Sequence, residues 1–190
     1  MLILVVGPSG AGKDTLLDLA RAALALDARV RFVQREITRP STAGGEHHRA
    51  ITPAEFATRR AGYALAWEAH GLGYGIPADI ADDLAAGRIV VANVSRGVIA
   101  AAAARFAVIV LEITAPPSLL AARLAARGRE TANDIAARLA RQMELPAGVP
   151  VLTVMNDRTQ AEGAAALVAA ILRVCPRSFD EVVPESWTGS

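Results

Sequence analysis

Residues 2–14 read Leu-Ile-Leu-Val-Val-Gly-Pro-Ser-Gly-Ala-Gly-Lys-Asp, and this stretch decides the fold. The first five residues are apolar, as in a buried strand, and a helical pattern begins at Lys13. Between them, Gly7 to Lys13 fit the spacing G-x-x-x-x-G-K, whose backbone N–H groups converge on phosphate oxygens. The N-terminus of the following helix adds its positive dipole. The stretch therefore predicts a strand, a phosphate-binding loop and a helix in succession.

Lys13 is the single lysine among twenty basic residues. A compact ammonium and a planar guanidinium are not interchangeable at a tight phosphate site, so we expect Lys13 to reach the β- and γ-phosphates of ATP. Asp14 stands where a hydroxyl residue usually assists Mg²⁺, and Thr15 follows it. The sequence leaves open which of the two assists the metal. The residues predicted to bind the nucleotide here are Gly7, Pro8, Ser9, Gly10, Ala11, Gly12, Lys13, Asp14 and Thr15.

Short apolar runs alternate with helical patterns along the chain. The predicted strands are Leu2–Val6, Val30–Val33, Arg88–Val94, Ala107–Ile113 and Val151–Met155. The predicted helices are Lys13–Leu26, Pro77–Ala86, Gly97–Ala104, Pro117–Arg127, Asp134–Met143 and Gln160–Val174. Strands that are apolar on both faces and separated by helices imply parallel pairing. The sequence thus predicts an α/β fold of three layers, with a mostly parallel five-stranded sheet between helices, as in phosphate-loop NTPases.

The composition bounds the function further. The chain has 190 residues, 53% of them hydrophobic, and its formal net charge is +1, so no excess of charge favours nucleic acid or an anionic membrane as partner. The N-terminus lacks the basic region of a signal peptide, and the lone Cys175 cannot form an internal disulfide. We therefore expect a cytoplasmic protein, with a single domain over residues 1–176 and a tail over 177–190. A homodimer is left open.

The class of phosphate-loop protein follows from what is missing. The strand that ends at Asn93 lacks the acidic residue of motor and AAA-type ATPases. Without a second lysine, the chain cannot form the Asn-Lys-x-Asp motif by which switch GTPases read guanine. What remains is a small-molecule kinase, in which cations neutralise the three equatorial oxygens of the transferred phosphoryl group. The residues predicted to do so are Lys13, Arg127, Arg129 and Arg138.

Two segments are predicted to complete the kinase. Residues 35–76 break the alternation of strands and helices, and we interpret them as an inserted acceptor-binding region. Within them, Thr52, Pro53 and Glu55 form the start of a helix, as N-cap, N1 and N3. Residues 123–141 are interpreted as a lid, because Arg127-Gly128-Arg129 interrupts two helical patterns. Closing such a lid would expel water from the transferring group.

Several stretches together resemble the guanylate kinase order over almost the entire chain. They are Gly7–Lys13, Thr38-Arg39-Pro40, Gly45-Glu46, Trp67–Pro77 and Arg127–Thr131. Gly12–Thr15, the run from Ala69 to Pro77, and Asn93–Arg96 are more similar to the ribose 1,5-bisphosphate phosphokinases of phosphonate catabolism. In that family an aspartate follows the loop lysine, as Asp14 does here.

The resemblance implies a reaction. It is the transfer of the γ-phosphoryl group of ATP, with Mg²⁺, to the sugar phosphate α-D-ribose 1,5-bisphosphate, giving 5-phospho-α-D-ribose 1-diphosphate (PRPP) and ADP. Guanylate kinases read guanine through side chains that Ala66 and Ile76 replace here, and neither can form a hydrogen bond. The alternatives are a guanylate or other nucleoside monophosphate kinase, and an interaction module without activity. Such modules usually lose the loop lysine, which is present here.

The resemblance also implies the residues that hold the acceptor. They are Arg35, Arg39, Glu46, Trp67, His70, Tyr74, Asn93 and Arg96. Arg39 and Tyr74 match phosphate-contacting residues, and Arg35 is interpreted as a substitute for an arginine that is missing near position 41. His70 either contacts the sugar phosphate or caps a turn. Asn156 follows the last predicted strand and resembles the family's adenine-edge loop, although Asn-Asp is also an ordinary turn.

Overall fold

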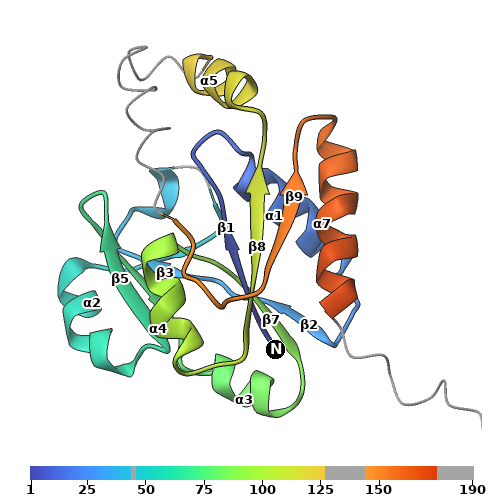
Figure 1. Cartoon of the computed structure of the whole chain (residues 1–190). Coiled ribbons are helices and arrows are strands. Elements are labelled where there is room, and N and C mark those ends of the chain that lie inside the picture. Colours follow the sequence, from blue (N-terminus) through green and yellow to red (C-terminus); the bar gives the residue numbers. More distant parts are fainter. Residues whose placement is uncertain (44–45, 127–143, 175–190) are drawn as a thin grey trace, which may run out of the picture.

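The structure is a computed structural model that describes residues 1–43, 46–126 and 144–174. Its centre is a five-stranded sheet in the order β2-β7-β1-β8-β9, in which every neighbouring pair is parallel. The strands are β1 (Leu2–Val6), β2 (Val30–Phe32), β7 (Ile89–Asn93), β8 (Val108–Thr114) and β9 (Val151–Met155). The predicted parallel sheet is therefore confirmed, with its carboxyl ends along one edge (Figure 1).

Helices cover both faces of this sheet, and β1 shows how. Its side chains alternate, so that Ile3 and Val5 join one buried cluster while Leu2, Leu4 and Val6 join the other. The first cluster packs under α1 (Lys13–Ala23) and α7 (Gln160–Val174), and the second under α3 (Ile80–Ala85) and α4 (Ile99–Ala103). A further helix, α5 (Pro117–Ala125), follows β8 (Figure 1). The three predicted layers are present.

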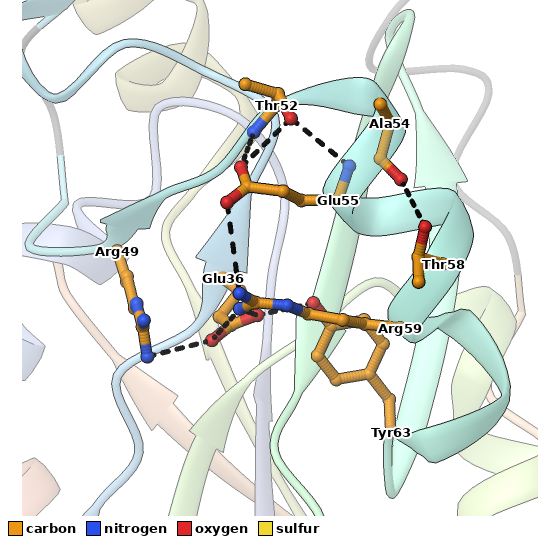
Figure 2. Close-up of polar contacts among 8 residues, drawn as sticks. All are labelled: Glu36, Arg49, Thr52, Ala54, Glu55, Thr58, Arg59 and Tyr63. Carbon is orange, nitrogen blue, oxygen red and sulfur yellow. Dashed lines mark hydrogen bonds and ion pairs between the residues drawn. The ribbon is translucent and has the colours of Figure 1, made fainter.

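A second sheet forms within residues 36–76, which the sequence set apart as an insertion. Its order is β4-β3-β6-β5, built from β3 (Glu36–Ile37), β4 (Arg49–Ala50), β5 (Leu65–Ala69) and β6 (Leu72–Ile76). The helix α2 (Pro53–Arg59) begins with the predicted capping box, in which Thr52 and Glu55 satisfy each other's backbone N–H groups (Figure 2).

A buried carboxylate attaches α2 to this sheet. Glu36 is 6% exposed, accepts a hydrogen bond from the Tyr63 hydroxyl, and lies 3.1 Å from an Arg59 nitrogen and 3.3 Å from an Arg49 nitrogen (Figure 2). Burial, together with the hydrogen bond to Glu36, raises the pKa of Tyr63 to about 12. The Tyr63 ring packs directly on β6, where a Cβ on Gly75 would lie 2.5 Å from it. Helix and sheet thus form one unit.

Helix boundaries are where the prediction was less accurate. The helix predicted to reach Leu26 ends at Ala23, and Leu26 is fully exposed, so its apolar side chain was a misleading signal. The helix predicted from Pro77 begins at Ile80. The one predicted from Gly97 begins with a 3₁₀ turn, Arg96–Val98, before α4. The predicted helix 134–143 lies outside the described residues. Among the helices that are described, none is long and apolar enough to cross a bilayer.

Candidate active site

The loop between β1 and α1 has the backbone that phosphate binding requires. Gly10 and Gly12 lie in the left-handed region, with φ of 85° and 81°. Gly7 is needed for a different reason, because a Cβ there would lie 2.0 Å from the Ile113 carbonyl oxygen on β8. The loop leads directly into α1, which begins at Lys13. Backbone N–H groups and a helix N-terminus are therefore combined at one turn.

Lys13 lies across this loop. Its Nζ donates to the carbonyl oxygens of Gly7 at 2.8 Å and Pro8 at 3.3 Å. Burial lowers the pKa of Lys13, and the positive charges of Arg35 and Arg96 lower it further, whereas nearby carboxylates oppose the change. A cluster of cations that disfavour one another is suited to a ligand with several negative charges.

The buried side chain of Asn156 is hydrogen-bonded to the backbone of the phosphate loop. It is 5% exposed, and its Nδ2 donates to the Ala11 carbonyl oxygen at 2.7 Å. A Cβ on Gly12 would lie 2.6 Å from the same Nδ2. The structure thus places Asn156 beside the predicted nucleotide loop, with its side-chain amide bound to the loop backbone. A contact with the nucleotide itself stays a prediction.

The two candidates for the metal are both exposed in the first turn of α1. Asp14 Oδ1 accepts a hydrogen bond from Asn93 Nδ2 at 3.2 Å. Asn93 ends β7, which is the neighbour of β1, so the residue that replaces the acidic strand end of ATPases lies opposite Asp14. The same Nδ2 lies 3.3 Å from Glu46 Oε2. One amide therefore connects the loop to the inserted region.

Arg35 lies at the centre of the predicted acceptor side. It forms a two-pronged ion pair with Glu46, in which Nε donates to Oε2 at 3.0 Å and Nη2 to Oε1. Its guanidinium also lies 5.8 Å from the ring centre of Trp67 and 5.3 Å from that of Tyr74. These two rings stack at 5.2 Å with an angle of 5°. The two-pronged ion pair with Glu46 and the two aromatic rings hold the Arg35 guanidinium in one orientation.

Tyr74 and Arg39 complete the acceptor side. Burial raises the pKa of Tyr74, and the Glu46 carboxylate raises it as well, while the positive charges of Arg35 and Arg39 lower it. The Arg39 Nε atom is buried and has no hydrogen-bond partner among the described residues. Its Nη2 lies 3.4 Å from His48 Nδ1. Two cations and a hydroxyl are therefore gathered where the sequence predicted contacts with a phosphate.

Arg96 is held by a residue that sequence analysis missed. Its Nη2 donates to Glu112 Oε1 on β8 at 2.6 Å. Glu112 is the one charged residue in the apolar run of this strand, and that interruption was the signal that could have identified it. His48 was missed as well, because its contacts are with backbone oxygens that no sequence pattern marks.

Other predicted residues lie elsewhere. His70 is exposed in the tight turn between β5 and β6, with φ of 54°, followed by Gly71 with φ of 73°. It thus forms a turn, and its predicted contact with the acceptor stays a prediction. Arg127, Arg129 and Arg138 lie outside the described residues. The first residue of the predicted lid, Arg123 on α5, is described, and its Nη1 donates to the carbonyl oxygen of Gly10 at 3.5 Å.

The two positions that would read guanine lie on opposite faces of the second sheet. Ala66 packs with Phe56 and Tyr63 beside α2, whereas Ile76 is fully buried in the cluster that includes Trp67. Neither carries a polar side-chain group. Ala66 therefore does not lie on the face that carries Trp67 and Tyr74, and of the two positions only Ile76 shares their cluster.

Comparisons with known proteins agree with this geometry. The chain is 52% identical over 177 residues to "Ribose 1,5-bisphosphate phosphokinase PhnN" of Methylobacterium radiotolerans, covering 92% of this chain and 98% of that protein. It is 49% identical over 176 residues to "Bifunctional ribose 1,5-bisphosphokinase-thymidine phosphorylase" of Azorhizobium caulinodans, of whose length it spans 25%. A guanylate kinase from Anaplasma phagocytophilum has a similar fold, with a TM-score of 0.64 at 15% identity over 94% of this chain and 87% of that one. No family model matches the chain.

Proposed function

Because the chain belongs to the ribose 1,5-bisphosphate phosphokinase family, we propose that it transfers the γ-phosphoryl group of ATP to the 1-phosphate of α-D-ribose 1,5-bisphosphate. The products are 5-phospho-α-D-ribose 1-diphosphate and ADP. One observation carries the proposal: the hydrogen bonds from Asp14 through Asn93 to Glu46 and Arg35 connect the phosphate loop directly to a cationic acceptor side. Donor and acceptor phosphates would therefore meet at this bridge.

The bound acceptor is proposed to rest on Arg35, Arg39 and Tyr74. The two guanidinium groups supply charge, and the Tyr74 hydroxyl supplies a hydrogen-bond donor. The resemblance to guanylate kinases places Ala66 and Ile76 where guanine would be read, and neither side chain can form a hydrogen bond, so we propose an acceptor with phosphates and no base. That combination describes a sugar bisphosphate.

The phosphoryl transfer requires mainly two things from the protein, which are positive charge around the transferred group and correct positioning of the two substrates. The attacking atom is an oxygen of a phosphate that is already anionic, so no residue has to act as general base. Lys13 is proposed to leave the carbonyl oxygens of Gly7 and Pro8 and to stabilise charge on the transferred group. The arginines expected to share this task are Arg127, Arg129 and Arg138.

The residues of the loop fit a magnesium nucleotide. Exposed oxygen ligands at the first turn of α1, from Asp14 or Thr15, are the type that Mg²⁺ prefers. When bound, Mg²⁺ neutralises charge on the phosphates of ATP. The Asn93 amide holds the Asp14 carboxylate on the side of β7, where the same amide also reaches Glu46.

A substrate panel tests the proposal. The purified chain is given Mg-ATP with α-D-ribose 1,5-bisphosphate or with GMP, ADP release is measured, and the product is identified by phosphorus NMR. We expect a diphosphate signal from the sugar and turnover at least about 10²-fold higher in kcat/KM than with GMP, as for a site that lacks the polar groups to read a base. Equal or faster turnover of GMP would make the chain a nucleoside monophosphate kinase. Failure to bind Mg-ATP would indicate an interaction module.

A further inference from the structure

His48 lies buried between Arg39 and Glu46, two residues of the predicted acceptor side. It is 8% exposed, whereas its neighbour His47 is exposed and histidine is on average only partly buried. Its Nε2 lies 3.1 Å from the Arg39 carbonyl oxygen, and its Nδ1 lies 3.0 Å from the Glu46 carbonyl oxygen. The ring therefore connects the backbone of Arg39 with the backbone of Glu46, the residue whose side chain pairs with Arg35.

The same ring also touches the side chain of Arg39. The Nη2 atom lies 3.4 Å from His48 Nδ1, and this is the only hydrogen-bond partner that the described residues provide for the Arg39 guanidinium. With its proton on Nε2, a neutral imidazole donates to the Arg39 carbonyl oxygen; Nδ1 then faces both the Glu46 carbonyl oxygen and Arg39 Nη2, and of these two only Nη2 can donate to it. His48 then holds Arg39 at both its backbone and its charged end.

We propose that His48 is a positioning residue for the acceptor, which fixes the guanidinium of Arg39 toward the phosphate without touching the substrate itself. This inference rests on the proposed function, since it takes Arg39 as a phosphate contact. A guanidinium on a long side chain loses its rotamer freedom on binding, and an imidazole that holds it beforehand removes part of that cost. The effect must therefore appear in acceptor affinity and pass through Arg39.

Two conservative substitutions separate the two ring nitrogens. In His48→Asn the amide oxygen takes the place of Nδ1 and can still accept from Arg39, whereas in His48→Gln the amide reaches the place of Nε2. We expect KM for the sugar bisphosphate to rise about tenfold in His48→Gln and only about threefold in His48→Asn, as when a hydrogen bond to a charged group is lost or weakened. KM for ATP and kcat should change less than about twofold, because the loop of Lys13 is untouched.

A double-mutant cycle with Arg39→Ala is the decisive measurement. If His48 acts through Arg39, adding His48→Gln to Arg39→Ala should raise KM for the acceptor by less than about twofold, because no guanidinium remains to be positioned. His47→Asn is the matched control, since His47 is the exposed neighbour and lies 3.2 Å from Gln34 rather than Arg39. It should leave both KM values unchanged.

The outcomes distinguish the inference from its premise. Additive effects of His48→Gln and Arg39→Ala on KM, or equal changes in the KM of both substrates, would overturn the positioning role and indicate a purely structural histidine. Thermal unfolding of each variant shows whether it is folded, and the Asn variant keeps the test valid where Gln disturbs packing. If GMP proves to be the better acceptor, the proposed function fails, but the same cycle measured with GMP still tests His48.

Discussion

Lys13→Met removes the only ammonium side chain of the protein while keeping its length. At an effective dielectric constant of 20, an ammonium about 4 Å from a phosphate charge contributes about 4 kcal/mol. In the unliganded loop Nζ already has two carbonyl acceptors, at 2.8 and 3.3 Å, and exchanging them reduces the gain by about 1 kcal/mol. The remaining 3 kcal/mol or so predicts a loss of kcat of between about 10²- and 10³-fold.

The free energy of unfolding of the Lys13→Met variant should not fall as its kcat does. Because burial lowers the pKa of Lys13, the charged form is disfavoured in the folded state, and the wild-type free energy of unfolding gains a contribution as pH rises toward the ordinary value of 10.5. The Met variant is free of this penalty, so near neutral pH its free energy of unfolding should be no lower than that of the wild type, and the difference should shrink as pH rises toward 10.5. Urea unfolding at several pH values measures both effects.

The assay couples ADP release to a spectroscopic signal at saturating ATP. Arg173→Ala removes an exposed cation from α7 and serves as control. Since Lys13 is the only lysine, an amine-reactive reagent can modify only this side chain and the N-terminus, and ATP should protect Lys13. A Lys13→Met protein with normal kcat, or a lysine that ATP does not protect, would refute the assigned role.

Three further predictions concern the metal, the inserted region and the loop. Asp14→Asn should raise the Mg²⁺ concentration for half-maximal activity about tenfold and reduce the thermal shift caused by Mg-ADP, whereas Asp18→Asn, one turn further on, should change neither; equal effects would exclude Asp14 as the metal residue. Tyr63→Phe should cost about 2 kcal/mol of unfolding free energy near pH 8. Because its folded pKa is raised to about 12, this contribution is complete below pH 10 and is lost as pH rises through 12, so wild type and variant should converge in alkaline urea unfolding, and a constant gap would contradict the cause given. Asn156→Ala removes the bond to the Ala11 carbonyl oxygen and should raise KM for ATP several-fold without changing KM for the acceptor; an unchanged KM for ATP would show that the loop keeps its shape alone.

The part of the fold that follows from local signals could be predicted from the sequence. The strand Leu2–Val6, the glycine loop and the helix from Lys13 are each marked by their own residues, and Thr52 with Glu55 marked a helix start correctly. Boundaries failed where an apolar residue such as Leu26 continued a pattern into solvent. The second sheet was not predicted as such, because strands of two residues, such as Glu36–Ile37, are too short to show a period.

For the predicted site residues, the structure shows pairings that the sequence does not reveal. Nothing in the sequence connects Asn93 with Asp14, which lies 79 positions away, or Arg96 with Glu112 on another strand. Such contacts depend on the order of strands in the sheet, which places β7 and β8 on either side of β1. His48 was not among the predicted site residues, because its bonds to carbonyl oxygens have no counterpart in residue types.

The Asn93 amide has a consequence for substrate binding. Its Nδ2 carries two N–H groups and lies 3.2 Å from an Asp14 oxygen and 3.3 Å from a Glu46 oxygen, so it can donate to both carboxylates but can shorten one of these bonds only by lengthening the other. If the nucleotide and its Mg²⁺ bind the Asp14 carboxylate, the Asn93 amide can donate more fully to Glu46. This bond would stabilise the ion pair that Glu46 forms with Arg35. The two substrates should then bind with synergy rather than independently, so that each lowers the dissociation constant of its companion by the same factor.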